Sequence, residues 1–160
     1  HTDFLTGLPN RRTFIERFST EIERAKRYNR TRTIAYIDVD NFKMLNDHYG
    51  HAVGDGALQK IAATLRGDIR KSDFVARMGG DEFLLYLPET NGTQAISSLK
   101  HLQDSLNEVT KTNALPITFS IGAITYVVPT SSAEEMIRTA DRIMYSAKSA
   151  GKNMIKHINA

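Results

Sequence analysis

The chain has 160 residues, 41% hydrophobic and 24% charged, which is enough for one domain with a sizeable core and excludes a disordered or fibrous protein. It contains no cysteine, which excludes disulfides, thiolate metal sites and cysteine nucleophiles and fits a reducing cytoplasm. The formal charge of +3 and pI of about 9.2 suit a small polyanionic ligand. The basic residues form no stripe with interleaved aromatics, so we expect no nucleic-acid partner. No apolar run approaches a membrane span and no signal peptide is visible, so we expect a cytoplasmic domain without direct membrane contact.

In chain order, the hydrophobic pattern first predicts a helix for which Asn10 is the candidate cap. The apolar face of this helix consists of Phe14, Phe18, Ile22 and Ala25. A nearly continuous apolar run then predicts a strand over 33–39. We expect a short helix through Tyr49 and a longer helix after it. The inward residues of the longer helix are Leu58, Ile61, Ala62, Leu65 and Ile69.

The middle of the chain predicts a hairpin. Residues 74–76 and 83–87 are rich in strand-forming types, and Gly79-Gly80 between them is typical of a turn that needs positive φ. A further helix follows, and a strand is expected from about 117 to 127. The inward residues of this helix are Ile96, Leu99, Leu102, Leu106 and Val109.

The end of the chain predicts one more helix and a short strand over 154–158. This helix opens with a capping box between Ser132 and Glu135 and ends near Gly151. Its inward residues are Met136, Ile137, Ala140, Ile143 and Met144. After the first helix, the order β-α-α-β-β-α-β-α-β predicts an α+β sandwich, with one mostly antiparallel five-stranded sheet covered by helices. No linker or repeat divides the sequence, so we expect a single domain.

Acidic residues mark two places in this pattern. Asp81 and Glu82 follow the Gly-Gly turn, which taken alone is an ordinary solvated hairpin. The predicted strand over 33–39 contains Asp38 near its end and is followed directly by Asp40, although a buried strand does not end in two acids for stability. If this strand lies beside the hairpin, Asp38 and Asp81 converge, and two carboxylates without nearby His or Cys select Mg²⁺ or Mn²⁺ over zinc. The start of the next helix offers free N–H groups, so a metal, these N–H groups and lysines suit a nucleoside triphosphate.

Six blocks of sequence resemble the GGDEF domain of bacterial diguanylate cyclases, and their order and spacing agree with that family throughout. The blocks are 3–11, 38–47, 50–55, 79–83, 120–122 and 147–153. The resemblance covers nearly the whole chain. It implies a palm-like nucleotide-cyclase fold and a domain that belongs to a longer regulated protein, whose other parts can include a membrane anchor.

The resemblance also implies a reaction, the condensation of two GTP into bis-(3′,5′)-cyclic dimeric GMP with release of two pyrophosphates. Asp38, Asp81 and the Val39 carbonyl are implied ligands of two Mg²⁺ (or Mn²⁺) ions per active site. Glu82 is implied to support the metal or the attacking hydroxyl, so Asp81, Glu82 and Asp38 are the expected catalytic residues.

The triphosphate is expected to contact the backbone amides of Asn41, Phe42 and Lys43 and the side chains of Lys43, Lys148 and Lys152. Lys152 departs from the arginine more common in the family, which keeps the charge but loses a bidentate contact. An alternative is that Lys148 and Lys152, at i,i+4, only complement a helix C-terminus.

The guanine base is expected to contact Asn46 and Asp55. Asp55 can accept from guanine N1–H and the exocyclic amine, and Asn46 can donate to the purine acceptors, whereas adenine presents the opposite pattern. The alternative makes Asn46 a capping residue and Asp55 the N-cap of a helix that opens at Gly56.

Arg70 and Asp73 fit the family's RxxD inhibitory motif and stand at the family's distance before the Gly-Gly turn. An Arg can bind guanine or a phosphate in bidentate fashion and an Asp can accept from guanine N–H groups, so a product-binding site is expected here. The alternative is an i,i+3 ion pair at a helix end.

Three classes of function remain open at this point. The first is an active diguanylate cyclase, the second a catalytically silent GGDEF module that binds GTP or the cyclic dinucleotide, and the third another palm-type nucleotidyltransferase. The intact acids and base-contacting residues favour the first. Because one chain carries one nucleotide site and the product contains two nucleotides, catalysis is expected to need a homodimer.

Overall fold

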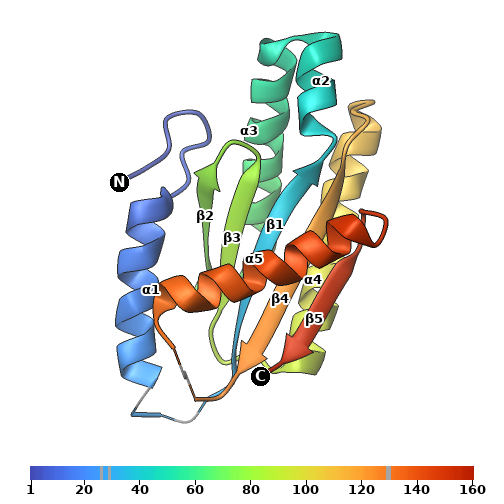
Figure 1. Ribbon diagram of the computed structural model, residues 1–160. Helices are drawn as coiled ribbons and strands as arrows, with labels where there is room; N and C mark the ends of the chain where they lie inside the picture. Colours follow the sequence, from blue (N-terminus) through green and yellow to red (C-terminus); the bar gives the residue numbers. More distant parts are fainter. Residues whose placement is uncertain (26, 29, 129–130) are drawn as a thin grey trace.

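A five-stranded sheet forms the centre of the computed structural model, which describes residues 1–25, 27–28, 30–128 and 131–160 (Figure 1). The strands follow the order β2-β3-β1-β4-β5, and only the β4–β5 pair among them is parallel. Their bounds are β1 (Arg32–Asp40), β2 (Phe74–Gly79), β3 (Glu82–Leu87), β4 (Thr118–Tyr126) and β5 (Ile155–Asn159). The predicted α+β fold with a mostly antiparallel sheet is therefore confirmed.

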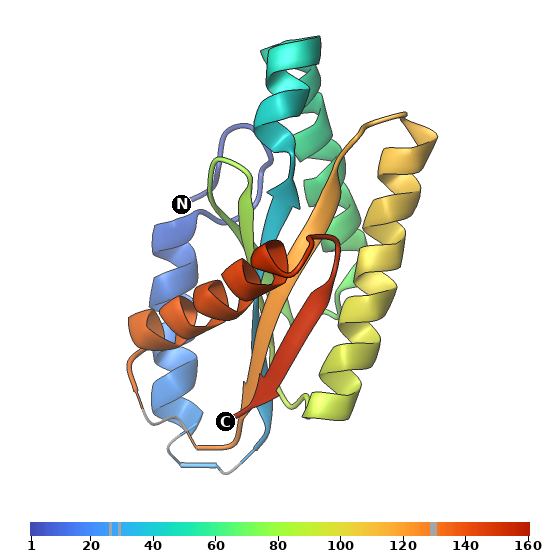
Figure 2. The same cartoon turned by 45° about the vertical axis from the view of Figure 1, so that its right-hand side comes forward.

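Helices cover both faces of the sheet, α3 and α4 on one face and α1 and α5 on the other (Figures 1 and 2). Their bounds are α1 (Arg11–Ala25), α2 (Phe42–Tyr49), α3 (His51–Asp68), α4 (Gly92–Thr112) and α5 (Ala133–Ser149). Because side chains alternate along a strand, Ile37 and Val39 of β1 join the core under α3 and α4, whereas Ile34 and Tyr36 join the core under α1 and α5. None of the described helices is long and apolar enough to cross a lipid bilayer.

The predicted inward faces hold for α1 and most of α5, and for Leu99, Leu102 and Leu106 of α4. All four apolar residues predicted to face inward from α1 are buried, and the Asn10 Oδ1 accepts a hydrogen bond from the Thr13 N–H at 2.9 Å. On α4, Ile96 is exposed and Val109 only half-buried, because the neighbouring Ala95 and Thr110 occupy the inward positions. Ile69, which was predicted to face inward from the helix now labelled α3, lies just beyond the end of α3 and is partly buried.

The helix caps differ in part from the predicted ones. The Ser132 hydroxyl accepts from the Glu135 N–H at 3.2 Å, but the Glu135 carboxylate pairs with Arg138. A complete capping box occurs instead at the start of α4, between Asn91 and Gln94. The sequence carries the signal for this box, an Asn followed three residues later by a Gln.

One close contact sets the position of α5 over the sheet. A Cβ atom at Gly122 of β4 would lie 2.0 Å from the backbone nitrogen of Met144. Only glycine allows the helix backbone to approach the strand this closely. The C-terminal half of α5, which includes Lys148, is thereby held against the sheet near the ends of β1 and β4.

Candidate active site

A hollow of about 490 Å³ opens where the end of β1, the hairpin turn, the start of α2 and the end of α5 meet. It is lined by Val39, Asn41, Phe42, Lys43, Met44, Asp47, His48, Asp81, Lys148 and Lys152. These include all of the residues that the sequence assigned to the phosphates, together with Val39 and Asp81 from the predicted metal ligands. The fold thus brings residues from three separate stretches of sequence into one site.

The strand and the hairpin lie side by side, as the convergence of the acids requires. Asp38 of β1 is the register partner of Glu82 of β3, and the Val39 N–H donates to the Asp81 carbonyl at 3.1 Å. Gly79 and Gly80 have φ values of 141° and 52°, so the predicted positive-φ turn is confirmed. Asp38, Asp81 and Glu82 therefore meet at one end of the sheet.

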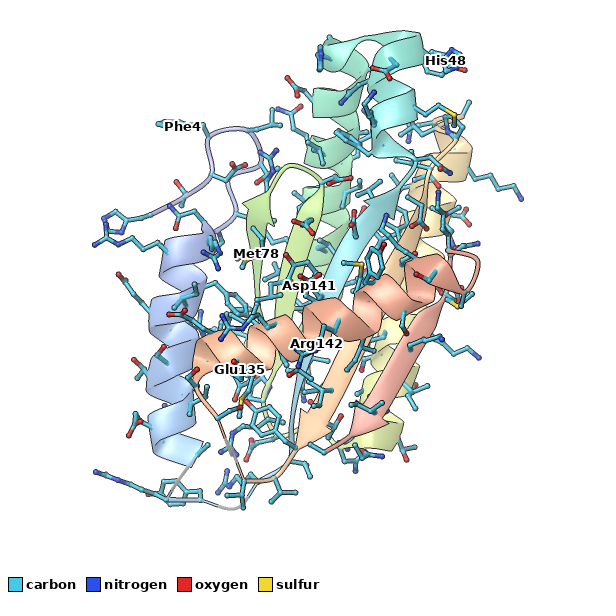
Figure 3. All side chains as sticks on the ribbon, viewed as in Figure 1. Phe4, His48, Met78, Glu135, Asp141 and Arg142 are labelled. Atoms are coloured by element: carbon cyan, nitrogen blue, oxygen red, sulfur yellow. The ribbon has the colours of Figure 1, made fainter. Side chains whose placement is uncertain are left out.

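The Asp38 carboxyl is short of compensating partners. Its side chain is 14% exposed, and among the described residues its Oδ1 has no hydrogen-bond partner, although the Lys148 Nζ lies 3.5 Å away. Burial and the neighbouring Asp81 charge raise the pKa of Asp38 to about 7, against the opposing effect of Lys148. Burial, Asp141 and Asp81 also raise the pKa of Glu82. Figure 3 labels Asp141 on α5, the helix that crosses this face of the sheet.

These acids fit a divalent cation. A cation would compensate the Asp38 oxygen that is buried without a hydrogen bond, and it would reduce the repulsion between the neighbouring carboxyl groups. Because the ligands are oxygen atoms, Mg²⁺ or Mn²⁺ fits best. Among the described residues, no three His, Cys, Asp or Glu side chains are grouped to hold a metal ion by themselves. A cation here would therefore depend on Asp38 and Asp81 together with backbone, water or substrate oxygens.

Asp40 is a site residue whose role the sequence analysis missed. It is fully buried, and its carboxylate accepts from Ser120 and Thr118 at 2.7 Å each and from the Asn153 N–H at 3.0 Å. The Lys148 Nζ lies 3.2 Å from it. Burial alone would raise the pKa of Asp40, but these hydrogen bonds lower it. Asp40 therefore ties β1, β4 and the loop after α5 together beneath the hollow.

The three predicted phosphate-binding lysines are held in different ways. Lys148 lies over Asp38 and Asp40, with its side chain 21% exposed. Lys152 lies outside α5 and donates to the Asn41 Oδ1 at 3.0 Å, so of these two lysines Lys148 alone stands in the last turn of the helix, where the alternative places it. Lys43 pairs with Asp47 at 2.9 Å on the exposed surface of α2.

The start of α2 carries no side-chain cap. Its N-cap residue, Asn41, has a left-handed backbone conformation, with φ of 65°, and accepts from Lys152 instead of the helix N–H groups. The first-turn N–H groups of α2 are therefore not satisfied by a capping side chain. This geometry suits a phosphate group.

The structure rejects the capping alternatives for both predicted guanine contacts. Asn46 lies within α2, and α3 begins at His51, so Asp55 lies inside that helix and is exposed. The Asn46 Oδ1 packs over Gly54, where a Cβ would lie only 1.7 Å from it, so Asn46 contacts the turn of α3 that carries Asp55. Neither residue lines the hollow itself. The Gly in the middle of α3 was the sequence signal for this contact.

Arg70 and Asp73 lie at the opposite end of the sheet, before β2, and form the i,i+3 ion pair of the alternative interpretation. The Arg70 Nη2 lies 3.0 Å from the Asp73 Oδ1, and the Arg70 N–H donates to the Asp73 Oδ2 at 2.8 Å. The guanidinium also donates to the Pro88 carbonyl and to Thr90, each at 2.9 Å. Product binding at this place remains a prediction.

Residues 1–154 match the family model for "Diguanylate cyclase, GGDEF domain". The chain is 39% identical over 158 residues to Diguanylate cyclase DgcP of Pseudomonas aeruginosa, covering 97% of this chain and 23% of that protein. The structure of diguanylate cyclase SiaD from P. aeruginosa, in complex with its activator SiaC, matches with a TM-score of 0.89 at 34% identity, covering 98% of this chain and 61% of that one. The GGDEF domain of DgcB from Caulobacter crescentus, in complex with c-di-GMP, matches with a TM-score of 0.87 at 27% identity, covering 98% and 94%. The chain spans less than half the length of the curated relatives that it matches.

Proposed function

Because the chain belongs to the GGDEF domain family of diguanylate cyclases, we propose that it condenses two GTP molecules into bis-(3′,5′)-cyclic dimeric GMP and releases two pyrophosphates. One observation carries the proposal. The acids Asp38, Asp81 and Glu82 meet beside a hollow that Lys148, Lys152 and the uncapped start of α2 border. Negative groups for cations and positive groups for phosphates are thus adjacent.

Asp38, Asp81 and the Val39 carbonyl would hold two divalent cations, which when bound neutralise the triphosphate and make the attacking 3′-hydroxyl more acidic. The residues of the chain orient the substrate around them. The first-turn N–H groups of α2 and the ammonium groups of Lys148 and Lys152 face the β- and γ-phosphates. Glu82, beside Asp38 in the sheet, supports the cations or the attacking hydroxyl.

Asn46 and Asp55 would select the base. The Asn46 side chain lies against Gly54, the residue before Asp55 in α3. Asp55 accepts from the N–H groups of guanine, which adenine does not offer in the same positions. Burying polar groups that match only guanine disfavours ATP by roughly 10⁴-fold.

Two further parts of the proposal concern assembly and control. Two copies of the chain face each other during catalysis, because each copy supplies one of the two nucleotides. The product also inhibits through Arg70 and Asp73. The DgcB structure, a related domain in complex with c-di-GMP, supports binding of the product in this family.

The test is to incubate the purified chain with GTP and Mg²⁺ and to separate the products by chromatography. We expect the cyclic dinucleotide and pyrophosphate, no product in EDTA and none from ATP alone. The rate per chain should rise with protein concentration in a dilution series. Binding of GTP or of the cyclic dinucleotide without turnover would favour a silent receptor, and turnover of ATP into another product would favour a different nucleotidyltransferase.

A further inference from the structure

The turn that carries Asp81 and Glu82 is not held by regular strand pairing alone. The register between β2 and β3 shifts between Arg77 and Gly79, so the ladder is irregular just before the turn. Gly79 and Gly80 follow, and glycine loses more conformational freedom than any other residue when its backbone is fixed. Some other contact must hold the turn in one conformation.

The Arg77 guanidinium makes that contact. Its Nε and Nη2 donate to the Gly80 carbonyl at 3.0 and 2.7 Å, and its Nη1 donates to both carboxylate oxygens of Asp3 at 3.0 and 3.1 Å. The side chains of Arg77 and Asp3 are 14% and 22% exposed, so solvent screens this ion pair less than a surface pair. One planar group thereby links the turn to a residue 74 positions earlier in the chain.

The amino-terminal segment, residues 1–10, is itself well anchored. The Asp3 carboxylate also accepts from the Thr6 N–H and hydroxyl at 2.9 and 2.7 Å. The Arg77 N–H donates to the Pro9 carbonyl at 3.0 Å, which gives the segment a second attachment to β2. In Figures 1 and 2 the segment lies beside the hairpin turn, and in Figure 3 Phe4 points away from the body of the molecule.

We propose that Arg77 is a positioning residue through which the amino-terminal segment holds the turn, and with it Asp81 and Glu82, beside Asp38. Gly80 immediately precedes Asp81, whose carbonyl is fixed on its other side by the Val39 N–H. Displacing Asp3 would therefore lower turnover without changing any group that contacts the substrate. The inference rests on the proposed function for its effect on catalysis, but its structural part can be tested without it.

The first experiment measures amide hydrogen exchange in a peptide that spans the turn, at residues 78–84. Arg77→Lys keeps the charge but cannot reach both partners, and Asp3→Asn removes the ion pair. We expect roughly 10-fold faster exchange in both variants, with unchanged exchange in α4. The matched control is Arg12→Lys, because Arg12 is 87% exposed and pairs with Glu16 on the surface of α1, far from the turn in sequence. Unchanged exchange in the turn, or an equal rise in the control, would overturn the proposal whether or not the chain is a cyclase.

The second experiment measures steady-state turnover of GTP by the same variants. We expect kcat to fall roughly 10-fold with KM for GTP within about twofold, because the turn positions the acids rather than binding the nucleotide. The double variant should lose no more than the more severe single variant, since both act through one contact. Additive losses, or a loss confined to KM, would contradict a shared positioning role. Wild-type chain that makes no product would refute the proposed function and leave the exchange test to decide on Arg77.

Discussion

Each end of the central sheet carries a buried aspartate, but the two carboxylates differ in how fully they are hydrogen-bonded within the chain. At the end with the hairpin turn, the Asp38 Oδ1 is buried without a hydrogen bond among the described residues. At the other end, the Asp73 carboxylate is 3% exposed and accepts from both the backbone and the guanidinium of Arg70. Asp73 therefore already has partners within the chain, whereas Asp38 still has a buried oxygen that a ligand could contact.

The basic residues at the two ends, Arg70 and Lys148, also differ in how many acids each one compensates. Arg70 divides its donors among Asp73, the Pro88 carbonyl and Thr90, which joins the start of β2 to the loop before α4. Lys148 is shared between Asp38 and Asp40, and Asp40 already receives three hydrogen bonds. One arginine therefore faces one aspartate at the RxxD end, whereas at the turn one lysine is shared by two aspartates. The following predictions test this comparison.

The largest effect is expected at the turn. Asp81→Ala should lower formation of the cyclic dinucleotide by about 1,000-fold or more, because metal-assisted steps contribute several kcal/mol of barrier reduction. Chromatographic assay of the variant with GTP and Mg²⁺ measures this. Asp104→Ala, at an exposed position of α4, is the control and should keep full activity. Undiminished activity of Asp81→Ala would refute the assignment of the acids.

At the RxxD end, Arg70→Ala should weaken inhibition by the cyclic dinucleotide roughly 10- to 100-fold, the usual effect of losing a bidentate contact. Titration of the product against wild type and variant, at low and at saturating GTP, measures it. Lys71→Ala is the control from the same exposed loop. Equal inhibition of both proteins, or inhibition that disappears at saturating GTP, would mean that Arg70 and Asp73 form only the ion pair seen in the structure.

Neutralising the two aspartates should change stability in different ways. Asp73→Asn should lower the free energy of unfolding by about 1–3 kcal/mol, because a satisfied buried charge is lost and the donors of Arg70 are left without it. Asp38→Asn, in EDTA, should be neutral or stabilising within about 1 kcal/mol, because its charge is poorly compensated in the fold. Urea unfolding of the two variants provides the comparison. A similar loss of stability in both would remove the distinction between the ends.

The smallest effect is a dependence of stability on pH. The pKa of Asp38 is about 7 in the folded chain, against a usual value of 3.8, so the folded state binds the proton more tightly than the unfolded state. The free energy of unfolding in EDTA should therefore fall as pH rises from about 4 to about 7, by about 1–2 kcal/mol once screening is allowed for. Asp38→Asn should flatten this slope, and so should Mg²⁺. A slope that is the same with and without Mg²⁺ would argue against a cation at Asp38.

Much of the site follows from local pattern. The Gly79-Gly80 turn, the acids at the end of β1 and the apolar face of α1 each depend on residues close together in sequence, whose spacing already determines strand, turn or helix. The clearest error in the predicted core, Ile96 on α4, arose because adjacent residues on a helix lie about 100° apart, so an inward position is easily assigned to the wrong neighbour. Packing against the sheet selected Ala95 instead.

The sequence by itself therefore determined the fold class, the order of the elements and which residue types could bind cations and phosphates, because these depend on local periodicity and motif spacing. Only the tertiary structure decided which of those residues are short of partners. The contacts of Asp40 with β4, of Asn46 with Gly54 and of Arg77 with Asp3 join distant positions, and they exist because the strand order and the crossing of α5 bring those positions together. Whether a polar side chain finds all of its hydrogen-bond partners depends on such long-range contacts, so it cannot be predicted from the sequence of one segment.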